Sequence, residues 1–338
     1  MDTSTSHVIT TSWLPSLARL EYLARILQVY GRPASGPLSF WHEQPEFNPA
    51  TRSDTRQYFM RFRGKADYTG PFDADGIPLL DYHGNIGRQY NPIAIAQYGL
   101  ARFNRWCDAG DDGDRTAWLS VSRWLTSTLQ SNAHGVPVWP HHFDWPYRSV
   151  LKGPWYSGLA QGNGVSMLVR AAAETGDGAF AAAAHRAFQA LELPISRGGV
   201  LATNGDREVW IEEYIVDPPS HILNGFIWAL WGVHDYARWS CRPRATALWD
   251  ACVTTLAARL DDFDIGWWSL YEAPTSDRRM LASFYYHRLH VVQLRVLYDL
   301  TGIEAFAARA AQFERYAHQP LSRARALVEK ACFKLRHY

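Results

Sequence analysis

Two adjacent carboxylates and a phenol precede a proline pair near the middle of the chain. Glu212, Glu213 and Tyr214 are followed by Pro-Pro at 218–219, and an apolar helical run begins at about residue 221. Because a proline pair interrupts regular structure, we expect the triplet on a short strand or loop that leads into a helix. A carboxylate held in a poorly solvated site has a raised pKa and is suited to proton transfer.

Aromatic and cationic side chains recur in the other segments between predicted helices. Aromatic residues make up 14% of the chain, with 15 Trp. A Trp-rich core would explain part of this content, but such residues gathered around one opening would also form a polysaccharide cleft. The candidates in these segments are Arg88, Tyr90, Trp155, Tyr271, Arg279 and Tyr286.

Histidines offer little support for a metal site. His141, His142 and Asp144 are close in sequence, but adjacent side chains point apart and no third ligand follows at a helical or strand spacing. His287 and His290 share a helix face, where core packing and substrate contact are both open interpretations. We expect neither a metal nor a cofactor.

From residue 92 onward, the apolar periodicity predicts helices in pairs. The predicted pairs are 93–109 with 116–129, 159–174 with 179–193, 222–239 with 245–260, and 285–300 with 304–318. Similar short turns join the members of each pair, at a repeat of roughly 62–66 residues. This pattern predicts a mainly α fold, an α/α toroid of about four helical hairpins, with a superhelical array as the alternative.

The first helix of each pair carries polar residues in an apolar context, as an inner ring around a cleft would. These residues are Gln97, Gln161, Asn163, Asn224, His287, His290 and Gln293. The second helices have one polar face, which is typical of an outer layer.

Three regions are predicted. Residues 1–90 form an N-terminal section with a helix over 13–30, a strand over 58–68 and a returning strand over 77–82, in which Arg61, Arg63 and Lys65 share a solvated edge. Residues 91–318 form the toroid, and residues 319–338 form a short basic helix and tail.

Composition limits the partners. The chain has 338 residues, with 34 basic and 33 acidic, so no overall charge favours nucleic acid. No apolar run is long enough to cross a membrane and no signal peptide is seen, so we expect a cytoplasmic protein. The four scattered cysteines are expected to be free, buried thiols. Exposed aromatic loops are compatible with a homodimer.

Four ordered motifs resemble the C-terminal catalytic domain of D-glucuronyl C5-epimerases, which convert glucuronic acid into iduronic acid within heparan-type chains. The motifs are Tyr90-Asn-Pro-Ile-Ala-Ile-Ala-Gln-Tyr-Gly-Leu100, Trp155-Tyr-Ser-Gly-Leu-Ala-Gln-Gly162 with Ser166-Met-Leu-Val-Arg170, Glu212-Glu213-Tyr214 with Leu223-Asn-Gly-Phe226, and Tyr286-His287-x-x-His290 with Gln293-Leu294. The resemblance covers about residues 77–316 and implies an α/α toroid that acts on an acidic, glucuronate-containing polysaccharide.

The resemblance also implies roles for individual residues. Glu213 and Tyr214 match the catalytic Glu-Tyr of the family, and Tyr271 and Tyr286 match two further tyrosines. The family sequence Tyr-Asp-Leu-Arg-His is Tyr271-Glu-Ala-Pro274 here, so the arginine expected to face the uronate carboxylate is missing. Arg278 or Arg279 is a hypothetical replacement.

The predicted chemistry removes the C5 proton with Glu213 and returns one to the other face from Tyr271 or Tyr286, with Tyr214 orienting or donating. A uronate lyase shares the first step and is the main alternative. A glycoside hydrolase would need a second acid, for which Asp144 and Glu272 are candidates. A glycan-binding module without catalysis is the remaining alternative.

Overall fold

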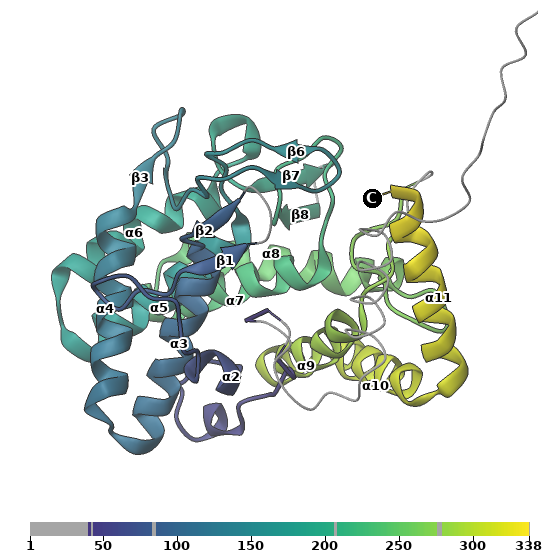
Figure 1. Ribbon diagram of the computed structural model, residues 1–338, viewed down its shortest axis with the longest axis horizontal. Helices are drawn as coiled ribbons and strands as arrows, with labels where there is room; N and C mark the ends of the chain where they lie inside the picture. Colours follow the sequence, from purple (N-terminus) through teal and green to yellow (C-terminus); the bar gives the residue numbers. More distant parts are fainter. Residues whose placement is uncertain (1–39, 42, 83–85, 206–207, 276–278, 338) are drawn as a thin grey trace, which may run out of the picture.

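Four helical pairs form most of the computed structural model, which describes residues 40–41, 43–82, 86–205, 208–275 and 279–337 (Figure 1). The pairs are α3 (Pro92–Ala109) with α4 (Asp112–Thr128), α5 (Gly158–Thr175) with α6 (Gly178–Glu192), α7 (Leu223–Ser240) with α8 (Pro243–Arg259), and α9 (Phe284–Thr301) with α10 (Glu304–His318). The prediction of four hairpins is confirmed.

The first helices of the pairs form the inner layer. Every residue of α5 from Gly158 to Ala172 is buried, whereas α6 buries only one face. Helices α5 and α7 approach closely through glycine, because a Cβ at Gly162 would lie 2.4 Å from the Cα of Ala229. The fold is an α/α toroid, as predicted.

The N-terminal ends of the inner helices lie at one rim. The Gly158 N–H at the start of α5 donates to the Glu212 carbonyl over 2.9 Å, and the Leu223 N–H at the start of α7 donates to the Tyr271 carbonyl over 3.1 Å. Each inner helix therefore begins beside the loop that leads to the next pair. This arrangement brings loops that are far apart in sequence to the same rim.

Four small antiparallel hairpins occupy the segments at this rim (Figure 1). They pair β1 (Leu80–Tyr82) with β2 (Gly87–Gln89), β3 (Gln130–Ser131) with β4 (Pro137–Val138), β5 (Trp145–Pro146) with β6 (Val150–Leu151), and β7 (Leu201–Asn204) with β8 (Glu208–Ile211). Single-turn 3-10 helices lie at Pro49–Arg52, Ile195–Arg197 and Leu260–Phe263.

The predicted strand over 58–68 is wrong. Phe62 has a left-handed backbone with φ of 52°, which starts the short helix α2 (Arg63–Ala66). Lys65 does not lie on a solvated edge, because its side chain is 1% exposed and its Nζ donates to the Phe40 carbonyl over 2.7 Å. The predicted helix over 13–30 lies outside the described residues.

The segment before α3 joins the first and last inner helices. The Asn104 side chain on α3 accepts a hydrogen bond from the Tyr58 N–H over 2.7 Å, and Arg52 forms a 3.0 Å ion pair with Asp299 on α9. These contacts link α3 to α9 through residues 52–58.

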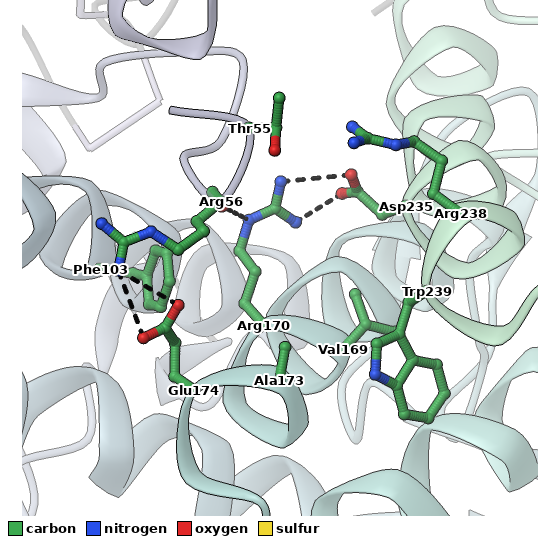
Figure 2. A pocket seen from close by; sticks show the side chains of 10 residues that line it. All are labelled: Thr55, Arg56, Phe103, Val169, Arg170, Ala173, Glu174, Asp235, Arg238 and Trp239. Carbon is green, nitrogen blue, oxygen red and sulfur yellow. Dashed lines mark hydrogen bonds and ion pairs between the residues drawn. The ribbon is translucent and has the colours of Figure 1, made fainter. Parts of the chain in front are cut away.

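An ion pair at the opposite rim ties this segment to α5 and α7. Arg170 and Asp235 are both buried, and the Arg170 Nη1 lies 2.5 Å from the Asp235 Oδ2 (Figure 2). Arg170 also donates to the carbonyls of Arg56, Ser166 and Gln57. Burial raises the pKa of Asp235, but its interaction with Arg170 more than offsets this and holds the pKa at about 2. The depression in Figure 2 is therefore built around an internal ion pair whose groups are already engaged.

Residues 320–337 form one long helix, α11 (Pro320–His337), at the edge of the toroid (Figure 1). Lys330 is buried and its Nζ donates to the Leu281 carbonyl over 2.6 Å, just before α9. The division of the chain at residues 90 and 318 stays a prediction. In the described part of the chain, no helix is long and apolar enough to span a membrane. The four cysteines are free, but the prediction that they are buried is wrong for Cys241 and Cys332, which are exposed.

Candidate active site

The adjacent carboxylates Glu212 and Glu213 have different surroundings. Glu212 is fully buried, and its Oε2 accepts hydrogen bonds from the N–H groups of Ser220 and His221 over 3.1 and 3.0 Å. Its Oε1 lies 2.5 Å from the His221 Nδ1. Glu212 therefore holds the turn that leads into α7, and its oxygens are occupied.

Glu213 lies against the first turn of α7. Its side chain is 4% exposed, and its Oε2 has no hydrogen-bond partner among the described residues. Only glycine fits beneath it, because a Cβ at Gly225 would lie 2.1 Å from that oxygen. Burial, together with the nearby Glu212 charge, raises the pKa of Glu213 to about 8, against a lowering contribution from Tyr214. This carboxyl can hold or release a proton near neutral pH.

Three predicted tyrosines gather beside Glu213. Tyr271 is the buried centre of a small cluster, and Tyr214, Tyr286 and Tyr147 pack against that cluster. The ring centroids of Tyr271 and Tyr286 are 4.8 Å apart, and those of Tyr147 and Tyr214 are 4.7 Å apart. Burial, reinforced by the charge of Glu213, raises the pKa values of Tyr214 and Tyr271 well above 10. Both phenols therefore carry their protons and are donors.

Backbone hydrogen bonds fix the positions of the two distant tyrosines. Tyr271 accepts from Leu223 at the start of α7 and donates its N–H to the Met280 carbonyl over 2.8 Å. The Tyr286 N–H donates to the hydroxyl of Ser283, the N-cap of α9, over 3.2 Å. The starts of two neighbouring inner helices thus set the spacing of the cluster.

Aromatic rings extend from the cluster along the rim. Trp155 meets Tyr214 edge-on with centroids 5.7 Å apart, and stacks on His141 at 3.8 Å. Phe143 links Trp155 to Tyr82 of β1, with centroid distances of 6.1 and 5.1 Å. Trp155, Tyr214 and Tyr82 are partly exposed, so these rings offer a surface on which sugars can stack.

The polar residues predicted for the inner ring are all buried. Gln161 and His287 are fully engaged inside the protein: the Gln161 side chain pairs with the backbone of Trp139 and Ala187, and His287 with Ser269 and the Phe313 carbonyl. Asn163 Nδ2, Asn224 Oδ1, His290 Nε2 and Gln293 Oε1 are buried without a hydrogen-bond partner in the described structure. Gln97 is buried as well, and the substrate-binding role of these residues stays a prediction.

The remaining predicted contacts lie on the surface. Arg88 on β2 is exposed and lies 3.7 Å from Asp81, and Tyr90 donates to Asp73 over 2.7 Å. Arg279 is exposed, and Arg278 lies outside the described residues. Of the predicted substrate-binding residues, Trp155 is the one that packs directly on the tyrosine cluster.

The residues considered for a metal site point in different directions. His141 is buried against Trp155, His142 is exposed 3.3 Å from the Gln130 side chain, and Asp144 pairs with Lys152. In the part of the chain that the structure describes, no group of three or more His, Cys, Asp or Glu could hold a metal ion.

Two residues of this site were not predicted. Tyr147 and Arg148 form the tip of the β5–β6 hairpin, and the tip reaches the buried Glu272. They stand in an aromatic, proline-rich loop, Trp-Pro-Tyr-Arg, which was the signal available. Nothing in the local sequence shows that this loop contacts a residue 125 positions further on.

The fold and site define a class of protein: an α/α toroid with a buried carboxyl and several phenols at the N-terminal rim of its inner helices. The family model described as "D-glucuronyl C5-epimerase C-terminus" matches residues 134–315, which is more than half of the chain. The chain belongs to the D-glucuronyl C5-epimerase family.

The chain is also similar to individual proteins. An uncharacterized protein of Methanocaldococcus jannaschii is 26% identical over 70% of this chain and 82% of its own length. A D-glucuronyl C5-epimerase of Caenorhabditis elegans is 28% identical over 60% of this chain, and the match spans 35% of that larger protein. Among solved structures, the unsaturated glucuronyl hydrolase of Bacillus sp. GL1 has a TM-score of 0.46 at 13% identity, covering 68% of this chain and 61% of its own.

Proposed function

We propose that this protein is an epimerase that inverts C5 of D-glucuronic acid residues to L-iduronic acid within a heparosan- or heparan-like polysaccharide. The observation that carries the proposal is that the buried Glu213 interacts with Tyr214 and Tyr271, and that Tyr214 and Tyr286 pack against the cluster around Tyr271. Family membership supports the same reaction class.

The first step breaks the C5–H bond. Glu213 takes the proton in its ionised form, and the electron pair is delocalised into the adjoining carboxylate. A carboxyl whose pKa is about 8 is a stronger base than an ordinary glutamate, which suits a weakly acidic carbon. The developing charge requires donors that are already in place.

The second step returns a proton to the opposite face of C5. Tyr271 and Tyr286 are the candidate donors, because both belong to the cluster beside Glu213 and the Tyr271 phenol is held in its protonated form. Tyr214 packs between this cluster and Trp155, where it can orient the sugar. Inversion requires two proton-transfer groups on opposite sides of one carbon. The Glu213 carboxyl is proposed for one side and a tyrosine phenol for the other.

A lyase would share the first step and then expel the C4 substituent. The two reactions are separated by incubating the protein with heparosan in heavy water. The proposal predicts deuterium at C5 and iduronate in the polymer, without the ultraviolet absorbance of an unsaturated uronate. Unsaturated product would show a lyase, and binding without deuterium uptake would show a glycan-binding module.

The hydrolase alternative finds less support in the geometry. Asp144 is exposed and paired with Lys152, and Glu272 is buried against Tyr147 and Arg148.

Gly225→Ala tests the position of Glu213. The added methyl would occupy the space of the Glu213 carboxyl, so we expect C5 exchange to fall by about 100-fold, the usual effect of misplacing a catalytic group by 1 Å. Alanine favours a helix over glycine by about 1 kcal/mol, so α7 should remain formed. Exchange is measured by NMR and folding by circular dichroism.

Gly178→Ala at the start of α6 is the matched control, because nothing lies within 4 Å of the added methyl. Exchange at the wild-type rate in Gly225→Ala would contradict the placement of Glu213.

A further inference from the structure

The tip of the β5–β6 hairpin brings a guanidinium group to the tyrosine cluster. The Arg148 Nη1 donates to the Pro218 carbonyl over 3.3 Å, in the loop between Glu213 and α7. The Arg148 Nη2 lies 3.3 Å from the Oε1 of the fully buried Glu272, next to Tyr271. The hairpin tip thus contacts both segments that carry the proposed acid and base groups.

One edge of this guanidinium has donors without a hydrogen-bond acceptor among the described residues. The Nε and Nη2 atoms of Arg148 are buried and have no hydrogen-bond acceptor in the described part of the chain, since the Nη2 approach to Glu272 is an ion pair without hydrogen-bond geometry. Adjacent N–H groups of a guanidinium fit the two oxygens of a carboxylate. Buried, charged donors without acceptors reduce the stability of the folded protein unless a ligand accepts their hydrogen bonds.

Tyr147 sets the distance from this edge to the chemistry. Its hydroxyl hydrogen-bonds with Glu272, while its ring packs on Tyr214 at 4.7 Å. One aromatic ring therefore separates the ion pair from the tyrosine cluster. In a uronate, the carboxylate is bonded directly to C5. The residue that binds the carboxylate must therefore lie next to the groups that move the C5 proton.

We propose that Arg148 binds the carboxylate of the reacting uronate through Nε and Nη2, while Glu272 and Tyr147 hold the guanidinium in position. This assignment rests on the proposed function for the identity of the sugar. It replaces Arg278 and Arg279 as the hypothetical partner of the carboxylate. The bound guanidinium also stabilises the extra negative charge that develops when the C5 proton leaves.

The test compares Arg148→Gln with Arg123→Gln, a control at an exposed position of the outer helix α4. Binding is measured with heparosan oligosaccharides and with the same oligosaccharides after reduction of their carboxylates to alcohols. The wild type and Arg123→Gln should prefer the carboxylate form by about 10- to 100-fold, the value of a charge-assisted hydrogen-bonded pair. Arg148→Gln should bind both forms with similar affinity.

A second variant keeps the test decisive if Arg148→Gln fails to fold. Arg148→Gln removes one ion pair of the buried Glu272, whereas the double variant Arg148→Gln/Glu272→Gln removes both charges of that pair. Thermal unfolding checks both proteins. The double variant should also lose the preference for the carboxylate form.

The outcomes separate this inference from the proposed function. Suppose that the wild type shows no C5 exchange, and that the preference for the carboxylate form is lost in the Arg148 variants alone. The epimerase proposal then fails, and the assignment of Arg148 stands. If the wild type exchanges C5 and the folded Arg148 variants keep the preference, Arg148 is not the carboxylate-binding residue. Loss of the preference in Arg278→Gln, with Arg148→Gln unaffected, also overturns the assignment.

Discussion

Replacing Glu213 by glutamine is expected to slow C5 exchange by about three orders of magnitude while the protein stays folded. Glutamine has nearly the same shape but cannot accept the C5 proton. Glu213 is buried with an unpaired Oε2, so no other described group holds that oxygen in a structural role. The rate is measured as deuterium incorporation into heparosan.

The same substitution should increase stability at alkaline pH. The pKa of Glu213 is raised in the folded protein from 4.5 to about 8, so the unfolded chain loses its proton first as pH rises. The folded state of the wild type is therefore penalised progressively between pH 4.5 and 8, by about 1.4 kcal/mol per pH unit. Glu213→Gln avoids this penalty, and its free energy of unfolding should exceed that of the wild type at pH 8 but not at pH 4.

Glu314→Gln is the control, because Glu314 is a partly exposed residue of outer helix α10 that pairs with Arg295. Its exchange rate should equal that of the wild type, and its stability should change by less than about 0.5 kcal/mol. Equal pH dependence of stability in Glu213→Gln and the wild type would rule out a raised pKa for Glu213.

Arg170→Met is expected to destabilise the protein by about 3–5 kcal/mol, since it leaves Asp235 buried without its partner. It also removes the hydrogen bonds to residues 56 and 57 that tie the N-terminal segment to the toroid. Urea unfolding at pH 7 measures the loss. The catalytic rate of the folded fraction should be retained, because Arg170 lies at the opposite rim from Glu213.

The double variant Arg170→Met/Asp235→Leu separates the charge from the packing. Removing both partners leaves no isolated charge, so most of the lost stability should return. A double variant as unstable as Arg170→Met would mean that the hydrogen bonds to the N-terminal segment, rather than the ion pair, carry the effect.

The helical hairpins could be predicted because their information is local. Apolar periodicity recurs at each pair, and Gly176 and Gly302 adopt the left-handed backbone that ends α5 and α9, whereas Cys241 takes this place at the end of α7. The strand predicted over 58–68 was wrong because the alternation of apolar and basic side chains there reflects contacts with other parts of the protein, not a strand with one solvated face. Lys65, for example, is buried by Glu43 and by aromatic residues that precede it in the chain.

The site could be predicted in part. Glu213, Tyr214, Tyr271 and Tyr286 were chosen by resemblance; in the structure Glu213 interacts with Tyr214 and Tyr271, and Tyr286 packs on Tyr271. Glu212 and Glu213 differ because only the Glu212 carboxyl reaches the turn at 220–221. The sequence alone does not show which of the two side chains points towards that turn. Tyr147 and Arg148 were missed because their relevance depends on a long-range contact with Glu272.

The most direct test of the central claim is the pH dependence of C5 deuterium exchange by the wild type. Glu213 can accept the C5 proton only when it is ionised, so the rate should rise with pH and level off above an apparent pKa of about 8, and this rise should be absent in Glu213→Gln. A wild-type midpoint near 4.5, or undiminished exchange in Glu213→Gln, would contradict the role of a buried Glu213 as the base.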